Sequence, residues 1–191
     1  MTEKKPRDNQ PRKPRIPTEE RLARQALHYL DRYASSTQNL RGVLERKVMR
    51  AARAHERDPA EFAEMIDAVV EKCQRSGVVS DLTYAEIKLT SLRRKGQSER
   101  KIAAYLGAHG VDRDTIGKVL KSDETDEIAA ARTYARRRRL GPFRTSGNRE
   151  EKRQRDLAAL CRAGYPYGLA RQVIDEELGD VADDDMGEAE D

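Results

Sequence analysis

The sequence predicts an all-α protein of three tandem three-helix, helix-turn-helix-like units that form an elongated, curved array between two disordered tails. Apolar residues recur at helical spacing from residue 18 to residue 178, without the alternation typical of a strand. Glycines recur directly after these periodic segments, where a left-handed residue ends a helix. Two distant stretches also share one pattern. These three observations predict the fold class.

The first unit is expected at residues 18–77, behind a basic arm at 1–17. The arm holds four prolines and few apolar side chains, so it cannot bury enough surface to offset the entropy of ordering. Within the unit, "DPAE" at 58–61 offers a cap, a first-turn proline and a capping-box glutamate. The apolar stripe from Phe62 to Cys73 then indicates a helix. The helices of this unit are predicted at 19–34, 37–54 and 59–76.

The second and third units are expected at residues 78–122 and 123–178, ahead of an acidic disordered tail at 179–191. Their helices are predicted at 81–95, 98–109 and 113–121, and at 124–140, 149–163 and 166–178.

The two units share a repeated pattern. When "YLGAHGVDRDTIGKVL" is aligned with "ALCRAGYPYGLARQVI", Gly110 matches Gly164 and Val111 matches Tyr165. A triplet this small cannot stand alone, but stacked neighbours share an apolar face.

Composition excludes several classes of protein. Hydrophobic residues make up 37% of the chain and charged residues 38%. No apolar run approaches the roughly 20 residues that span a bilayer, and the basic start lacks the apolar segment of a secretory signal, so we expect a cytoplasmic protein with no membrane contact. Cys73 and Cys161 are expected to be buried free thiols. The three histidines are scattered, so no metal site is expected.

No catalytic pattern is present either. The chain has no phosphate-cradling glycine loop and no Ser/His/Asp spacing. We therefore expect no enzyme activity and no cofactor.

Charge is distributed unevenly along the chain. Ten of the 34 acidic residues lie in 175–191, which hold no Lys or Arg. The rest of the chain therefore holds 24 acidic and 38 basic residues. The body is therefore strongly basic, and nucleic acid or an acidic protein surface is its natural partner. The tail is either a solubilising end or a competitor that folds back over the basic surface.

Four consecutive arginines, Arg136–Arg139, raise the question of a binding site. Four residues sweep nearly the whole circumference of a helix, so they cannot all face water on one side. An arginine on the inward side must snorkel, meet a carboxylate or face a ligand. Two interpretations stay open, a contact with a polyanion and a merely solvated helix end that complements the helix dipole.

Other basic residues flank this run or end the equivalent helix of the second unit, where they could continue one basic track. Tyr134 and Tyr167 are the best exposed candidates for stacking on bases. The candidates for contact with a partner or DNA are Arg132, Arg136, Arg137, Arg138, Arg139, Arg144, Arg149, Lys152 and Arg153, and, in the second unit, Arg93, Arg94, Lys95, Arg100 and Lys101.

Four stretches carry a resemblance to a known family. "ALHYLDRYASSTQNLRGVL" (26–44), "GVVSDLTYA" (77–85), "KGQSERKIAAYLGAHGVDRDTIGKVL" (95–120) and "LCRAGYPYGLARQVI" (160–174), in this order, resemble the RecX family of recombinase regulators. The resemblance covers about residues 22 to 178. It departs at Ser80, where the family usually shows Asp, in the longer link "RTSGNR", and in both tails.

The resemblance implies a function that periodicity does not. It implies a protein, expected to be monomeric, that binds the filament of the RecA recombinase on single-stranded DNA and limits its growth, ATP hydrolysis and strand exchange. Double-stranded DNA is a further expected ligand. The alternative from the residues alone is a general DNA-binding or chromatin-associated helical protein without a recombinase partner.

Overall fold

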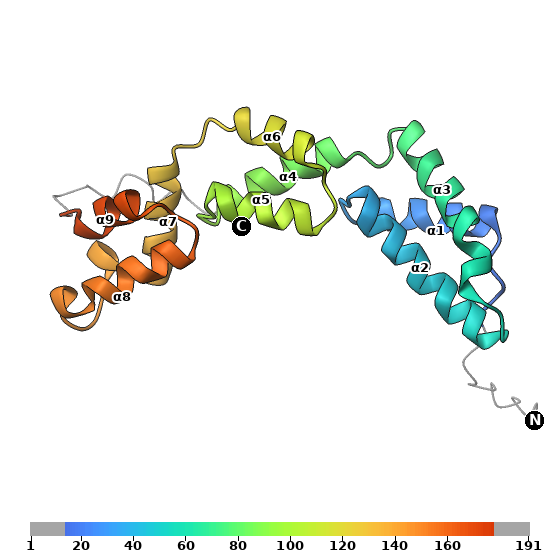
Figure 1. Ribbon diagram of the computed structural model, residues 1–191, viewed down its shortest axis with the longest axis horizontal. Coiled ribbons are helices and arrows are strands. Elements are labelled where there is room, and N and C mark those ends of the chain that lie inside the picture. The colour runs from blue at the N-terminus through green and yellow to red at the C-terminus, as the bar shows by residue number, and fades with distance from the viewer. Residues whose placement is uncertain (1–13, 178–191) are drawn as a thin grey trace, which may run out of the picture. The chain divides into compact units, whose positions relative to one another are not determined.

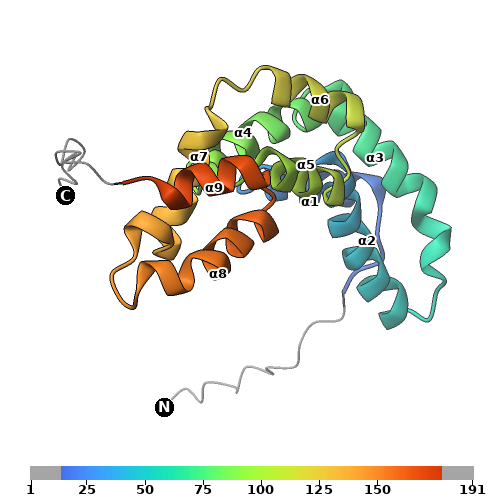
Figure 2. The ribbon, with the colours of Figure 1, turned by 60° about the vertical axis from the view of Figure 1, so that its left-hand side comes forward.

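Helices make up all the regular secondary structure of residues 14–177, which are the residues that the computed structural model describes (Figures 1 and 2). The all-α prediction is confirmed. The predicted helix starts agree to within a few residues, because most of them depend on a local capping side chain. The elements are α1 (Glu19–Leu30), α2 (Thr37–Ala54), the 3-10 turn η1 (Pro59–Phe62), α3 (Ala63–Arg75), α4 (Asp81–Arg93), α5 (Glu99–Ala108), α6 (Arg113–Lys121), α7 (Glu127–Arg138), the 3-10 turn η2 (Gly141–Phe143), α8 (Arg149–Arg162) and α9 (Tyr167–Asp175).

These elements form two compact units. In the described chain, the first unit holds residues 14–84 with 109–111, and the second holds 85–108 with 112–177. Helix α4 begins in the first unit and continues in the second. The three-unit boundaries expected from the sequence stay a prediction.

In the first unit, α1, α2 and α3 pack against one another around one apolar core. The helical stripes of the sequence supply this core, with Leu22, Leu44 and Val69 at its centre. The predicted capping box of Asp58 and Glu61 is present, but it starts the turn η1, and the α-helix begins at Ala63. Burying these stripes, at about 25 cal/mol per Å², is the main force that holds the triplet together.

The chain enters this unit in an ordered conformation. The sequence placed residues 14–17 in the disordered arm, yet Pro17 is buried and the ring Nε2 of His55 lies 2.7 Å from the carbonyl oxygen of Pro14. Ordering is possible here because α2 offers these residues a surface that composition does not reveal. The rest of the predicted arm, 1–13, and the predicted acidic tail, 179–191, lie outside the described residues.

A polar joint fixes the start of α2 to residues from later in the chain. The Ser36 hydroxyl donates to the carbonyl of His109 over 2.5 Å, and the Thr37 N–H donates to Oδ1 of Asp81 over 2.7 Å. Gly110, with φ of +80°, passes so close that an added Cβ would lie 1.8 Å from the side chain of Gln38. The glycine is therefore required for close approach as well as for its left-handed backbone.

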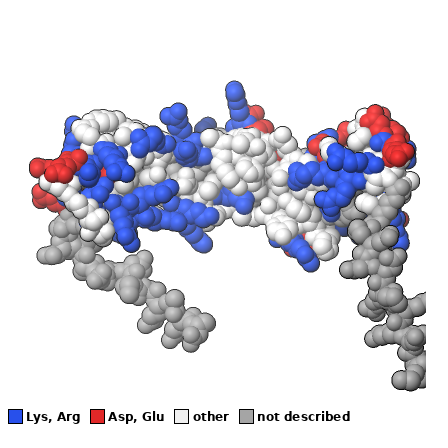
Figure 3. All heavy atoms as spheres, turned by 90° about the horizontal axis from the view of Figure 1, so that it is seen from below, with Lys and Arg blue, Asp and Glu red and all other residues white. Residues whose placement is uncertain are grey.

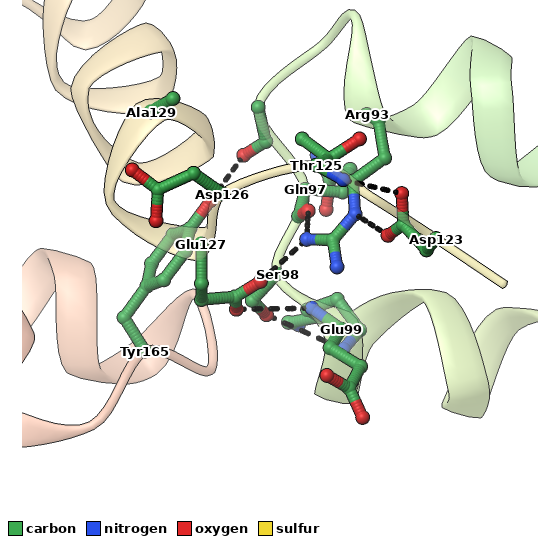
Figure 4. Close-up of polar contacts among 12 residues, drawn as sticks. Arg93, Gln97, Ser98, Glu99, Asp123, Thr125, Asp126, Glu127, Ala129 and Tyr165 are labelled. Atoms are coloured by element: carbon green, nitrogen blue, oxygen red, sulfur yellow. Dashed lines mark hydrogen bonds and ion pairs between the residues drawn. The ribbon is translucent and has the colours of Figure 1, made fainter. Parts of the chain in front are cut away.

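The second unit contains the same joint at the start of α5 (Figure 4). The Ser98 hydroxyl donates to the carbonyl of Ala163 over 2.7 Å, and the Glu99 N–H donates to Oε1 of Glu127 over 3.1 Å. A Cβ on Gly164, whose φ is +98°, would lie 2.5 Å from the Ser98 hydroxyl oxygen. Both joints therefore pair a capping serine, an acidic first turn and a glycine.

Helix α2 ends in the same backbone conformation without a glycine. Glu56 has φ of +52° and an exposed side chain. Among the described residues, Arg139 is the other non-glycine residue with positive φ. A left-handed side chain costs roughly 1–2 kcal/mol, so each of these positions carries some backbone strain.

In the second unit, α7, α8 and α9 form a second core around Ala131, Leu160 and Val173, and both views show these helices side by side (Figures 1 and 2). Helix α7 begins at Glu127 and not at 124, because Asp126 supplies the N-cap. It ends at Arg138, with Arg139 in the left-handed cap. The expected stop at Gly141 is therefore wrong by two residues, and Gly141 instead opens η2 against Ile174.

The two cysteines are unpaired with each other in the described part of the chain. Cys73 is buried and Cys161 half-buried, both thiols are free, and burial raises the pKa of Cys73. Between residues 14 and 177, no cluster of His, Cys, Asp and Glu could hold a metal ion. Over the same residues, no helix has the length and apolar character to cross a membrane.

Candidate polyanion-binding surface

One of the predicted contact residues, Arg93, lies inside the second unit and not on its surface (Figure 4). Its Nε donates to Asp123 over 2.5 Å, and its Nη1 donates to Glu127 over 2.5 Å and to the carbonyl of Gln97 over 3.1 Å. The residue is 9% exposed. Its guanidinium is therefore occupied between α4 and the start of α7, and Arg93 does not belong to the candidate surface.

The charges of this network are stabilised by each other. Burial, the largest influence, lowers the pKa of Arg93, but hydrogen bonds with Glu127 and Asp123 outweigh it and raise that pKa above its usual value. Burial also acts to raise the pKa of Asp123, while hydrogen bonds from Thr125 and Arg93 outweigh it, so that the carboxyl titrates below its usual range. Arg93 and Asp123 are therefore both ionised at neutral pH.

Three further candidates bind residues at the C-terminal end of the described chain. Arg132 makes a bidentate pair with Glu176, at 2.7–3.0 Å, and Arg153 pairs with Asp175 at 2.6–2.7 Å. Arg149 donates to the carbonyl of Glu176. These arginines therefore face the beginning of the acidic segment of the chain. A polyanion that binds them must compete with those carboxylates.

The four consecutive arginines all reach solvent, because the helix ends among them. Arg136–Arg138 occupy the last turn of α7, and the left-handed Arg139 turns the chain away from the helix axis. The Arg136 guanidinium lies 5.3 Å from the ring centre of Phe143, and that of Arg138 lies 5.9 Å from the ring centre of Tyr134. Arg138 and Arg139, whose positions continue the inward side of the helix, thus line a pocket and do not enter the core.

That pocket, which we call the arginine pocket, has a volume of about 390 Å³. Arginines from three segments line it: Arg138 and Arg139 at the end of α7, Arg144 in the link, and Arg155 and Arg162 on α8. Figure 3 shows Lys and Arg side chains gathered over the α7–α8 part of this unit. Arg155 and Arg162 were not among the predicted residues, although their seven-residue spacing places them on one face of a helix.

Arg144 is positioned in this pocket by a buried acid. Both carboxylate oxygens of Asp156 bind its guanidinium, at 2.7 and 3.1 Å, and the hydrogen bond raises the pKa of Arg144. Asp156 is 1% exposed and also accepts from the Gly141 N–H over 2.9 Å. One acid thus ties the link, η2 and α8 together.

The remaining candidates do not line the arginine pocket. Arg94, Lys95, Arg100 and Lys101 are exposed at the end of α4 and the start of α5, and Lys152 is half-buried on α8. None of these five side chains has an ion pair with a described residue.

The tyrosines divide between core and surface. Tyr167 is 57% exposed, as expected, and so is Tyr33 on the first unit. Tyr134, expected to be exposed, is instead half-buried, because its ring packs edge to face on that of Tyr165 with ring centres 6.1 Å apart. Tyr165 donates its hydroxyl to the carbonyl of Gly96 over 2.8 Å, so this pair helps to hold the second unit together.

Comparison with known proteins assigns the chain to a family. The family model for the second three-helix domain of RecX matches residues 80–120, which hold α4, α5 and all but the last residue of α6. The regulatory protein RecX of Myxococcus xanthus is 43% identical over 175 residues, which cover 90% of this chain and 93% of that protein. The chain belongs to the RecX family.

Other RecX proteins extend the match beyond one organism. The regulatory protein RecX of Agrobacterium fabrum is 30% identical over 83% of this chain and 86% of its own length. The regulatory protein RecX of Thermobifida fusca is 36% identical over 60% of this chain and 62% of its own length. The relatives are named as regulators. The RecX assignment therefore extends over nearly all of the described helices.

Proposed function

We propose that this RecX-family protein binds the RecA filament on single-stranded DNA and limits its growth, ATP hydrolysis and strand exchange. The observation that carries the proposal is the family match over 90% of the chain. The surface supports it, because exposed arginines at the end of α7 suit a partner that presents phosphates or carboxylates.

The protein acts by occupying the filament and not by turnover. The relatives are named as regulatory proteins, and the exposed basic side chains suit binding. We propose a monomer that works in the cytoplasm, where the filament forms, and that also binds double-stranded DNA through the same charges. Inhibition should therefore scale with the ratio of this protein to RecA.

The deciding experiment measures RecA-dependent ATP hydrolysis at fixed RecA while single-stranded DNA is raised well above the amount that RecA covers. A filament binder continues to inhibit, because its target is RecA on DNA. If excess DNA restores full hydrolysis, the protein only sequesters DNA. The alternative, a general DNA-binding protein without a recombinase partner, would then be the better description.

A second experiment tests the surface. Changing Arg136–Arg139 together to glutamine should weaken filament binding by more than about ten-fold at moderate salt. The matched control changes four exposed basic residues of α2, namely Arg46, Lys47, Arg50 and Arg53, and removes the same charge from the first unit. Equal losses from both variants would mean that only total charge matters. Intact binding and fold in the first variant would make the run a solvated helix end.

A further inference from the structure

The arginine pocket concentrates positive charge that the described residues do not neutralise. Of its five arginines, Arg144 is paired with Asp156, the one acid that lines the pocket. Arg138, Arg139, Arg155 and Arg162 are exposed and have no ion pair within residues 14–177. Like charges held around one cavity repel each other, and an anion bound among them relieves that repulsion.

The pocket is also held in shape before any ligand arrives. Asp156 fixes Arg144 and the Gly141 N–H, and Arg144 donates a further bond to the carbonyl of Ser146 over 3.2 Å. Arg139 is placed by the left-handed backbone that ends α7. The link side of the pocket is thus ordered before an anion binds, and less entropy is lost there on binding.

The lining favours a phosphodiester over an acidic protein surface. Protein interfaces are anchored by aromatic and apolar side chains in dry pockets. Here the apolar lining is limited to Leu140 and Ala159, while Thr145 and Ser146 add hydroxyl groups beside the arginines. Guanidinium forks and hydroxyls are the groups with which proteins hold the phosphates of nucleic acids.

We propose that the arginine pocket binds a backbone phosphate of single-stranded DNA and so fixes α7 and α8 on the strand. This deepens the proposed function, on which it rests for the identity of the bound strand. The link between η2 and α8 supplies Arg144, Thr145 and Ser146 to this pocket.

The test compares two pairs of arginines with equal charge and adjacent positions. Arg138→Gln with Arg139→Gly removes two pocket arginines, and glycine is tolerated at the left-handed position. Arg136→Gln with Arg137→Gln removes two arginines of the same turn that do not line the pocket. Binding to a fluorescein-labelled 20-mer of thymidylate is followed by anisotropy over a range of salt, and the circular dichroism of each variant is recorded to confirm its fold.

The pocket pair should weaken binding about ten-fold at moderate salt and flatten the log–log salt slope by about 0.7 for each phosphate that is no longer neutralised. The control pair should weaken binding about two-fold. Equal effects of the two pairs, or no effect of the first, would overturn the proposal. If the first pair unfolds the protein, Arg155→Gln with Arg162→Gln on α8 removes two other pocket arginines and carries the same expectation.

The outcomes separate this proposal from the proposed function. If the pocket pair binds thymidylate more weakly, the phosphate site is supported, whatever the wild-type protein does to RecA. If the wild-type protein fails to inhibit ATP hydrolysis by RecA, only the proposed regulation of RecA is rejected. If the pocket pair binds thymidylate as before but binds assembled RecA filaments more weakly, the pocket contacts carboxylates on the surface of RecA. That result would overturn the phosphate site and leave RecA regulation standing.

Discussion

Replacing Arg93 with methionine should destabilise the protein and leave its polyanion surface intact. The change removes the cation that two carboxylates share. The Asp123 side chain is 6% exposed and that of Glu127 is 27% exposed. Removing one partner of a buried ion pair costs about 3–5 kcal/mol, because the other charge stays buried without compensation. Methionine fills most of the volume but supplies no charge.

The lower end of this range is expected. Asp123 keeps its bond from the Thr125 N–H at 3.1 Å, and Glu127 keeps the Glu99 N–H. A loss of about 3 kcal/mol lowers the melting temperature of a chain of this size by roughly 6–12 °C. The assays are urea unfolding followed by circular dichroism, and thermal unfolding at the same pH.

Arg94→Met is the matched control. Arg94 is adjacent and exposed, and it has no ion pair with a described residue, so its loss should change the free energy of unfolding by less than about 0.5 kcal/mol. DNA binding below the unfolding transition should not fall more in Arg93→Met than in the control. Equal stability of the two variants would refute this expectation, since Arg93 would then contribute nothing to the fold.

Three other predictions follow from the same unit and its tail. Gly96→Ala should lower the free energy of unfolding, measured in urea, by about 2 kcal/mol more than Gly77→Ala. Both glycines have similar positive φ, but of the two only Gly96 lies so close to backbone that a Cβ would be 2.5 Å from the Tyr134 nitrogen. Equal costs would contradict this contact. Folding lowers the pKa of Asp123, so its ionised carboxylate stabilises the folded protein fully above the unfolded pKa and progressively less as pH falls below about 4. Asp123→Asn should therefore flatten the acid limb of the stability–pH curve. Deleting 179–191 should tighten binding to single-stranded DNA several-fold at low salt, and unchanged affinity would mean that the acidic residues do not compete.

The helices could be predicted because their signals are local. The stripe that includes Ile66 and Val69 and the capping box at Asp58 are both readable within a few residues, and both are present. The end of α7 was misplaced because a glycine two residues further on is the usual stop. Tertiary packing of Gly141 against Ile174 uses that glycine for close approach and leaves the left-handed turn to Arg139.

The candidate site was predicted only in part, because its contacts join distant segments. Periodicity placed Arg93 at the end of a helix, but it could not reveal that acids at 123 and 127 lie against it. Likewise the basic run was visible, whereas the pocket needs Arg155 and Arg162 from another helix. The signal that could have helped is the pair of capping serines, Ser36 and Ser98, whose hydroxyls bind the carbonyls just before Gly110 and Gly164 and so mark where distant segments meet.

The left-handed Glu56 has a consequence for the engineering of this protein. At Gly110 and Gly164 the same backbone conformation comes with close packing, because a Cβ there would collide with the side chain of Gln38 or of Ser98. Glu56 is exposed, so its Cβ is tolerated and the cost is backbone strain alone. Glycine would release that strain, and the greater freedom of the unfolded chain would cancel only part of the gain. The end of α2 is thus a position where one substitution stabilises the protein and leaves the arginine pocket unchanged.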